Sequence, residues 1–522
     1  MLWQPTSAFV ERSHLRQYLE WMAQNYDLKF HNYDEAWRWS VENVADFWES
    51  VWKYFKVISH SPYSRVLSSD KMPGAKWFEG ATLNYAEHVF RAAPGDDSRP
   101  AIVFSSERHD RVEISWEELR SQVASLAAWL REQGIGRGDR VVAYLPNIPE
   151  ATIAFLATCS IGAVWSSCSP DFGTNSVVDR FAQIAPRVLF AADGYTYNGK
   201  PYDKRQVINE LCEKLPTIEK TVLIPYLNPE ARPEDVGTPS RPAILWNDTF
   251  RHNVPLSFEA VPFDHPIYVL YSSGTTGIPK AITHSHGGNL LEHLKYLHFH
   301  NDVHPDERFF WFSTTGWMMW NFVNASFLAG ATVVLYDGSP GYPDLNRLWD
   351  FAEKAHIDHF GTSAPFLVAC MKQDLSPGRD FNLSALRSIG STGAPLPPEA
   401  FDFVYDNIKK DVWLCSMAGG TDVCTAWVGG CPLWPVHRGE IQCRCLGAAI
   451  EAWNEAGDPV EQEVGELVVT KPMPSMPVYF WNDPGNERYL SSYFEMYPGV
   501  WRHGDRIEIP PQKGDVKHGR SD

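Results

Sequence analysis

One stretch of the chain carries the residue types that bind polyphosphates. Tyr271-Ser-Ser-Gly-Thr-Thr-Gly-Ile-Pro-Lys-Ala-Ile282 places four hydroxyl residues and two glycines before a lysine. Glycines let backbone N–H groups approach an anion, hydroxyls donate hydrogen bonds and the lysine adds a positive charge. The stretch is not a Walker loop, because no Gly-Lys-Ser/Thr ending follows. A plain surface turn is the general alternative, but the length and order of this string favour a phosphate-binding loop.

The loop predicts a contiguous set of nucleotide contacts: Ser272, Ser273, Gly274, Thr275, Thr276, Gly277 and Lys280. For Thr276 and Lys280 we also expect a catalytic role, because a reaction between two anions depends on positioning and charge neutralisation. The apolar run Ile267-Tyr-Val-Leu-Tyr271 in front of the loop predicts a buried strand.

Strand and helix patterns alternate around this loop. Ser13 is a predicted N-cap in the N-terminal segment, and Ser115-Trp-Glu-Glu118 is a predicted capping box. Alternation of this kind predicts a largely parallel sheet covered by helices. The predicted strands of this region are Arg140–Leu145, Ala163–Cys168, Val333–Tyr336, Ile357–Phe360, Leu386–Ser391 and Val412–Cys415. Shorter strands at Glu440–Gln442, Ala448–Trp453 and Glu466–Thr470 predict a small β subdomain.

The loop string resembles the phosphate-binding loop of adenylate-forming enzymes, the superfamily of acyl-CoA synthetases, luciferases and peptide-synthetase adenylation domains. Further strings agree with the family in order and spacing: Gly393-Ala-Pro395, Ser416-Met-Ala-Gly-Gly-Thr-Asp422, Trp501-Arg-His-Gly-Asp505 and Gly519-Arg-Ser-Asp522. The resemblance covers nearly the whole chain, including Gly74–Tyr85, which is similar to the segment before the core of short-chain acyl-CoA synthetases. It implies an acid–thiol ligase with ATP, Mg²⁺ and CoA as cofactor and co-substrates.

The resemblance assigns expected roles to these strings. Thr421 is expected to bond the α-phosphate, Asp505 and Arg520 to contact the ribose, and Asp522 to be the hinge residue. The remaining expected ATP-binding positions are Gly393, Ala394, Pro395, Ser416, Met417, Ala418, Gly419 and Gly420. Asp422 is the expected Mg²⁺ ligand and, with Thr421, an expected catalytic residue. The family commonly has Glu at this position, and Asp is one methylene shorter, so a bridging water is an alternative to direct ligation.

Thr314-Thr-Gly-Trp-Met-Met-Trp-Asn321 matches the family segment between the acyl pocket and the pantetheine tunnel. The expected acyl pocket is Trp317, Met318, Met319, Thr392 and Gly419, and Trp317 and Met319 are also expected on the CoA path. Such a cluster of aromatic and Met residues in general more often belongs to a core. Acetate-activating relatives have a tryptophan at the position of Gly419, so we expect the missing indole to open room for two more carbons. Acetoacetate is therefore the expected acid.

The implied fold is an α/β large domain with two layered αβ subdomains, mainly parallel sheets and a small distorted β-barrel. The expected divisions are a helical and aromatic N-terminal lobe over 1–95, αβ subdomains over 96–265 and 266–424, a β subdomain over 425–515 and the start of a hinge over 516–522. The family's small C-terminal domain carries a catalytic lysine, and none of it follows Asp522. We therefore expect this chain alone to bind nucleotide and to be badly impaired in adenylation.

Composition excludes several classes of function. The 522 residues carry a net charge of −18, which opposes binding to nucleic acid or to an anionic membrane surface. Nine cysteines do not make a disulfide scaffold, Glu11 and Arg12 precede any apolar run, and no stretch predicts a membrane span, so a cytosolic protein is expected. Small molecules are the expected partners; the sequence leaves the oligomeric state open, with a monomer favoured.

Two alternatives remain open at this point. The substrate could be another short acid, such as propionate, butyrate or a hydroxybutyrate, because Gly419 argues for room and not for one particular acid. The chain could also be a nucleotide-binding module without catalysis. The intact loop with Lys280, together with Asp422 and Asp505, favours the enzyme.

Overall fold

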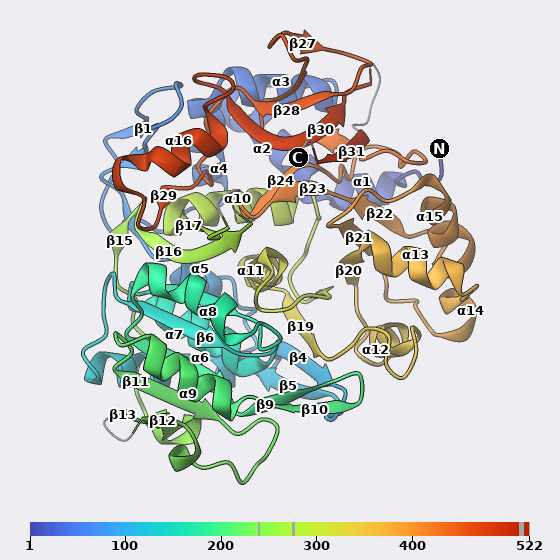
Figure 1. Cartoon of the computed structure of the whole chain (residues 1–522). Coiled ribbons are helices and arrows are strands. Elements are labelled where there is room, and N and C mark those ends of the chain that lie inside the picture. The colour runs from blue at the N-terminus through green and yellow to red at the C-terminus, as the bar shows by residue number, and fades with distance from the viewer. Residues whose placement is uncertain (239–240, 274–276, 511–515, 521–522) are drawn as a thin grey trace.

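The computed structural model describes residues 1–238, 241–273, 277–510 and, as backbone, 516–520. Two large twisted sheets form its centre, and helices lie on both faces of each (Figure 1). The predicted mixed α/β fold with mainly parallel sheets is confirmed.

The first sheet has eight strands and is parallel over most of its width. The phosphate loop joins its antiparallel strands β16 and β17, so the predicted strand before the loop is confirmed. In sheet order the strands are β14 (Ile244–Leu245), β11 (Lys220–Ile224), β8 (Val188–Ala192), β6 (Arg140–Tyr144), β7 (Val164–Cys168), β16 (Pro266–Ser272), β17 (Lys280–Ser285) and β29 (Tyr479–Phe480).

The second sheet has seven strands, and its parallel strands end at the loops that carry the other predicted site residues. In sheet order these strands are β22 (Trp413–Ser416), β21 (Ser388–Thr392), β20 (His359–Ser363), β18 (Arg308–Trp311), β19 (Thr332–Asp337), β4 (Pro100–Ser106) and β5 (Val112–Ser115). The predicted strand at Ile357–Phe360 begins two residues later than expected.

The sheets exchange strands across the expected division at residue 265. β4 and β5 precede that residue but pair in the second sheet, where β4 lies beside β19. β16 and β17 follow it but pair in the first sheet, where Tyr268 lies opposite Trp165 of β7. The division at 265 therefore does not coincide with the division between the sheets.

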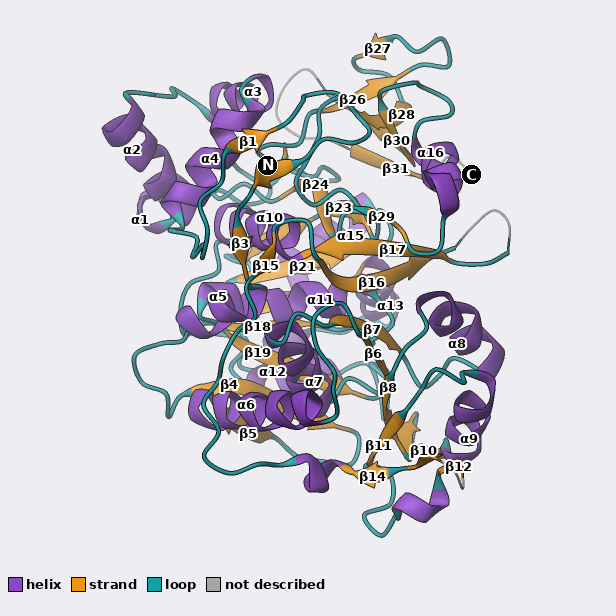
Figure 2. Cartoon of the chain, turned by 90° about the vertical axis from the view of Figure 1, so that its left-hand side faces the viewer, coloured by secondary structure: helices purple, strands orange, loops and turns teal. Residues whose placement is uncertain are grey.

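Helices complete five layers. α8 (Thr174–Phe181) and α9 (Arg205–Lys214) cover the outer face of the first sheet, and Figure 2 shows them on the side away from α7. α12 (Arg347–Lys354), α13 (Ala364–Lys372) and α15 (Pro398–Phe403) cover the outer face of the second sheet, with the short α14 (Pro377–Asp380) beside them. The helices between the sheets are α5 (Tyr85–Arg91), α6 (Trp116–Glu132), α7 (Pro149–Ser160), α10 (His286–Phe299) and α11 (Met318–Ala325). The predicted capping box opens α6, where Ser115 and Glu118 exchange hydrogen bonds.

Helix α10 is buried along its whole length. It follows β17 directly, so it begins at the strand that leaves the phosphate loop. A Cβ at Gly287 would lie 2.2 Å from the Phe263 ring, and one at Gly288 would lie 2.0 Å from the backbone oxygen of Pro474. Glycines are therefore required here because neighbouring segments approach the helix backbone closely.

The N-terminal lobe packs against the C-terminal part of the chain. Its helices are α1 (Ser7–Arg12), α2 (His14–Tyr26), α3 (Tyr33–Glu42) and α4 (Val44–Tyr54), and Ser13 caps α2 as predicted. It also holds the two-stranded pair β1 (Arg65–Leu67) and β2 (Trp77–Glu79). The Tyr33 hydroxyl donates to the Arg444 carbonyl at 2.6 Å, and the Gly447 amide donates to Ser40 Oγ at 2.8 Å.

The structure does not show the closure of the predicted distorted barrel, because the C-terminal strands form open sheets among the described residues. The larger sheet has five antiparallel strands, and its outer strands β27 and β31 stand at opposite edges: β27 (Pro459–Val460), β26 (Ile450–Trp453), β28 (Gly465–Val469), β30 (Trp501–Glu508) and β31 (Val516–Arg520). A three-stranded sheet holds β23 (Ala418–Gly420), β24 (Thr425–Gly429) and β25 (Cys443–Arg444). The strand expected at Glu440–Gln442 is not formed, and β25 follows it instead. Helix α16 (Glu487–Tyr493) lies against β30.

The remaining short pairs are β9 (Gly194–Tyr197) with β10 (Lys200–Asp203), β12 (Gly237–Thr238) with β13 (Arg241–Pro242), and β15 (Val261–Pro262) with β3 (Thr82–Leu83). Among the described residues, no helix combines the length and the apolar character needed to cross a bilayer. All nine cysteines are buried free thiols.

Buried histidines make the fold acid-sensitive. Burial lowers the pKa of His284 and His293 to about 4, and that of His88, His298 and His300 to about 3. Between pH 6.5 and 4 the unfolded chain therefore binds protons that the folded chain excludes. Each such histidine removes about 1.4 kcal/mol of stability per pH unit as pH falls through this window.

We expect the thermal unfolding temperature to decrease as the pH is lowered from 7 to 5, and to change little between pH 8 and pH 7. Paired carboxylates affect stability only at lower pH. Burial raises the pKa of Glu307, but His359 and Arg387 outweigh it and lower this pKa to about 2. Scanning calorimetry across these pH values tests the expectation, and an unfolding midpoint that is constant from pH 7 to pH 5 would contradict it.

Candidate functional site

A cleft of about 400 Å³ collects residues from six separate segments of the chain. Its lining comes from both large sheets and from the C-terminal β subdomain. The lining residues are Ser272, Ser273, Lys280, Trp317, Met318, Met319, Thr392, Gly393, Ala394, Pro395, Met417, Gly419, Gly420, Thr421, Asp422, Thr425, His503, Gly504 and Asp505. Most of the predicted site residues therefore face one common space.

The phosphate end of the cleft is formed where β16 and β17 meet the loop. Ser272 Oγ is buried there without a hydrogen-bond partner among the described residues, so it is available to an oxygen-rich ligand. Lys280 Nζ lies 5.2 Å from the ring centroid of Tyr493. Gly277 has a φ of +86° and does not line the cleft. The expected contacts Gly274, Thr275 and Thr276 lie outside the described residues.

Thr421 and Asp422 occupy the turn between β23 and β24. The Asp422 carboxylate accepts a hydrogen bond from the Tyr493 hydroxyl through Oδ1. Mg²⁺ is usually bound by one or two protein carboxylates together with phosphate oxygens and water. An aspartate at the cleft wall, facing the same space as Lys280 and Ser272, fits that requirement.

Buried polar groups of β17 and α10 form hydrogen bonds to the turn that carries Thr421 and Asp422. His284 Nε2 donates to the Thr421 carbonyl at 3.0 Å, and His293 Nε2 donates to the Cys424 carbonyl at 2.9 Å. Because burial lowers their pKa to about 4, both rings are neutral near pH 7 and each carries one N–H. His284 belongs to β17, so the phosphate-loop strand directly supports the turn.

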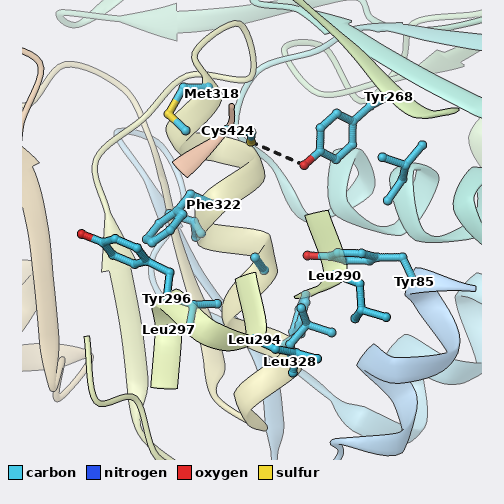
Figure 3. Close-up of a cluster of buried hydrophobic side chains, with 14 of the residues drawn as sticks. Tyr85, Tyr268, Leu290, Leu294, Tyr296, Leu297, Met318, Phe322, Leu328 and Cys424 are labelled. Atoms are coloured by element: carbon cyan, nitrogen blue, oxygen red, sulfur yellow. Dashed lines mark hydrogen bonds between the residues drawn. The ribbon is translucent and has the colours of Figure 1, made fainter. Parts of the chain in front are cut away.

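Helix α10 supplies the rest of this support. Thr425 Oγ1 donates at 2.8 Å to Glu292 Oε1, which also forms a 2.7 Å ion pair with Lys295. Both charged side chains are fully buried, so removing either one would leave an uncompensated charge. Figure 3 shows Cys424 beside the Tyr268 hydroxyl, which donates to its sulfur at 3.4 Å, with Phe322 of α11 and Leu290, Leu294 and Leu297 of α10 below.

The ribose end of the cleft lies on β30. His503 Nε2 is 3.3 Å from Asp505 Oδ2, and both side chains are at least nine-tenths buried. His503 Nδ1 has no hydrogen-bond partner among the described residues. In the backbone register Asp505 lies opposite Arg520 of β31, so two expected ribose contacts are adjacent. The expected hinge residue Asp522 lies outside the described residues.

The loop after β21 connects the expected adenine and acyl regions. Gly393 has a φ of +87°, a conformation that favours glycine, and a Cβ there would lie 3.6 Å from the Trp317 ring. Gly393, Ala394 and Pro395 line the cleft, whereas Ser416 and Ala418 line a small recess of about 30 Å³ that shares this loop.

Trp317, Met318 and Met319 form the acyl end together with Thr392. Trp317 stands at the N-cap of α11, and Met319 is 1% exposed. Thr392 Oγ1 donates to the Met417 carbonyl at 3.0 Å, so its hydroxyl hydrogen is already used and its oxygen remains an acceptor. The predicted cluster is therefore both a core element and a cleft wall.

The expectation that the missing indole at Gly419 enlarges the acyl pocket does not agree with the geometry of this position. A Cβ at Gly419 would lie 2.0 Å from the Thr425 carbonyl oxygen and 2.4 Å from Ala426 Cα, so it would point at β24 and not into free space. A Cβ at Gly420 would lie 2.6 Å from the His503 ring. The missing side chains allow β24 to lie close to Gly419 and His503 to lie close to Gly420. The absence of a side chain at Gly419 therefore does not explain the volume of the cleft.

The sequence prediction missed several residues of the site. Thr425 lines the cleft, and no local pattern distinguishes it from an ordinary strand residue. His503 and Gly504 stand inside a recognised string but received no role. His284 and Tyr493 contact the predicted catalytic turn from 137 and 71 residues away in the sequence, a relation that only folding creates.

Another group of possible metal ligands lies outside the cleft. His14, Asp302 and His304 offer ligand atoms within 4.8 Å of one another. The Arg387 guanidinium already contacts Asp302 Oδ2 at 2.7 Å, and the His14 amide donates to Oδ1 at 2.8 Å. This aspartate is thus already neutralised by Arg387.

Comparison with known families gives two matches along the chain. Residues 89–480 match the model of the AMP-binding enzyme family, and residues 33–89 match the acetyl-coenzyme A synthetase N-terminus. The second match covers the part of the N-terminal lobe from α3 to the middle of α5.

Individual proteins are similar over the whole chain. An acetoacetyl-coenzyme A synthetase of Rhizobium meliloti is 45% identical, with 100% of this chain and 79% of that protein covered. The acetoacetyl-CoA synthetase of Gallus gallus is 41% identical over the same shares. The solved structure of an acetoacetyl-CoA synthetase from Streptomyces lividans has a TM-score of 0.95 and 48% identity, and the match covers 100% of this chain and 80% of that one.

The glycine pair of the turn yields a testable contrast. Gly419→Ala forces a backbone shift of β23 or β24, so we expect a loss of roughly 1–3 kcal/mol of stability and weaker ATP binding. Gly420→Ala meets a side chain, so we expect a smaller loss of stability. Differential scanning fluorimetry and ATP titration of both variants measure this, and a Gly419→Ala protein as stable as the parent would contradict the assigned geometry.

Proposed function

This chain belongs to the AMP-binding enzyme family, and we propose that it converts acetoacetate, ATP and CoA to acetoacetyl-CoA, AMP and pyrophosphate. The observation that carries the proposal is the common cleft, in which the loop strands, the Thr421–Asp422 turn, Asp505 and the Trp317 segment meet. In the first step a carboxylate oxygen attacks the α-phosphorus and pyrophosphate leaves. In the second step the CoA thiol attacks the acyl carbon and AMP leaves.

The first step brings two anions together, so charge neutralisation and positioning dominate its catalysis. We assign Lys280, Ser272 and Ser273 to the polyphosphate, with Gly274, Thr275, Thr276 and Gly277 as the rest of the expected cradle. Thr421 is assigned to the α-phosphate because it lines the same cleft as Lys280 of the phosphate end and Trp317 of the acyl end.

Mg²⁺ would be held by Asp422 and by phosphate oxygens, and when bound it would neutralise charge on the phosphates. Residues of this chain orient the Thr421–Asp422 turn before Mg²⁺ binds. His284 fixes the carbonyl of Thr421, and Tyr493 fixes one oxygen of the Asp422 carboxylate.

The nucleoside is assigned to the other end of the cleft. A carboxylate can accept hydrogen bonds from two ribose hydroxyls, and Asp505 lies opposite Arg520, the second expected ribose contact. We assign the Gly393–Pro395 loop and Met417, which line the cleft, to the adenine.

We assign Trp317, Met318, Met319 and Thr392 to the acyl group. Three of them are apolar, and Thr392 Oγ1 retains acceptor capacity only. Gly419 keeps β24 close instead of adding volume. The CoA thiol is assigned to the side of the acyl site formed by Trp317 and Met319. A cytosolic location agrees with nine free thiols and remains a proposal.

Acid-dependent pyrophosphate release tests the proposed substrate. We expect acetoacetate to give the highest kcat/KM in a panel with acetate, propionate, butyrate and 3-hydroxybutyrate. Lys280→Gln should reduce release by at least about tenfold, since it removes a charge-assisted contact of about 1.5–3 kcal/mol. Lys71→Gln, an exposed lysine outside the cleft, is the matched control.

The outcomes separate the alternatives. Faster release with butyrate or propionate would replace acetoacetate by another short acid. The panel is measured on protein of the full length of its relatives, of which this chain covers 79%, because residues 1–522 alone are expected to be impaired in adenylation. In that protein, ATP binding without release for any acid of the panel would favour a nucleotide-binding module.

A further inference from the structure

Tyr493, the last residue of α16, stands beside the candidate site in a tightly packed position. It is 3% exposed, and its ring stacks on Trp501 with centroids 3.6 Å apart and an interplanar angle of 14°. The Phe480 ring packs edge-on at 5.6 Å. Trp501 begins β30, the strand that carries His503 and Asp505, so Tyr493 is fixed to the ribose end of the cleft.

Two predicted catalytic residues of opposite charge contact this one side chain. The Tyr493 hydroxyl donates to Asp422 Oδ1, and Lys280 Nζ lies over the Tyr493 ring at 5.2 Å. A cation over an aromatic face is attracted to it, more strongly where water is excluded. The tyrosine therefore contacts the lysine of one segment through its ring and the carboxylate of another through its hydroxyl.

The hydroxyl is suited to act as a permanent donor. Its acceptor is the Asp422 carboxylate, and the Tyr493 side chain is 3% exposed, so water does not compete for this hydrogen bond. With Oδ1 held, Oδ2 is the oxygen directed toward Gly420, whose backbone lines the cleft. A short aspartate has little freedom to reorient once one oxygen is bound.

We propose that Tyr493 is a positioning residue of the adenylation site, which orients Asp422 for Mg²⁺ through its hydroxyl and steers Lys280 through its ring. The inference rests on the proposed function for the meaning of Asp422 and Lys280. It goes beyond that function by adding a residue from α16 for which the sequence offered no motif. Its two parts are separable, because the hydroxyl and the ring can be removed independently.

Tyr493→Phe removes the hydroxyl and keeps the ring, so it isolates the contact to Asp422. We expect calorimetry to show ATP binding without Mg²⁺ unchanged, while the tightening of ATP binding by Mg²⁺ is reduced at least about tenfold, as expected for loss of a hydrogen bond to a charged group. The Mg²⁺ concentration for half-maximal pyrophosphate release should rise correspondingly. Tyr493→Leu should in addition weaken ATP binding without Mg²⁺, because Lys280 loses its aromatic support.

Tyr489→Phe is the matched control. Tyr489 is a buried tyrosine one turn earlier on α16, and its hydroxyl donates to the Pro477 carbonyl at 3.4 Å. This variant should keep the Mg²⁺ dependence of the parent protein. Asp422→Asn combined with Tyr493→Phe should be no worse than Asp422→Asn alone, because both changes act on the same carboxylate.

Unchanged Mg²⁺ dependence in Tyr493→Phe would overturn the proposal. Equal weakening of ATP binding with and without Mg²⁺ would also overturn it, since that result indicates a general structural role. The calorimetric readout needs no acid substrate. Failure of acetoacetate to support pyrophosphate release would therefore count against the proposed function, and the Mg²⁺ effect on ATP binding would still decide the role of Tyr493.

Discussion

The site depends on buried hydrogen bonds that join two parts of the chain. Strand β17 and helix α10 form one part, and the turn after β23 forms the other. His284 and His293 donate to the carbonyls of Thr421 and Cys424, and Thr425 donates to the Glu292–Lys295 pair. A buried polar group without a hydrogen-bond partner destabilises the folded state, so few other positions of the turn relative to α10 are possible. The strand that leaves the phosphate loop and the turn that carries Asp422 are thereby held in one geometry.

The glycines of this region follow from the same constraint. Gly287 and Gly288 let α10 lie against Phe263 and Pro474, and Gly419 lets β23 lie against the backbone of β24. The close approach is thus a property of the backbone. This explains why reading Gly419 as an absent side chain in a pocket wall led to the wrong geometry, although the residue does line the cleft.

Charge in the cleft is arranged before any substrate binds. Lys280 and Asp422 reach it from different segments, and the neutral ring and hydroxyl of Tyr493 stand between them. In an acidic protein of net charge −18, one lysine beside a carboxylate makes a local site for a metal–polyphosphate complex, whereas the surface as a whole repels anions. An acyl group meets this polar end through the Trp317–Met319 segment, which is largely apolar.

The sequence alone determined the features that are encoded locally: the loop with Lys280, the strand before it, the Ser115 cap and the family strings through Asp505. Capping, hydrophobic periodicity and motif spacing act over a few residues, so they can be read from the chain. Only the tertiary structure decided that β4 and β5 join the second sheet, that the described C-terminal strands pair in open sheets, and that Tyr493 binds Asp422. Those relations join residues far apart in sequence, and they exist because sheet pairing and core packing are chosen by the whole fold.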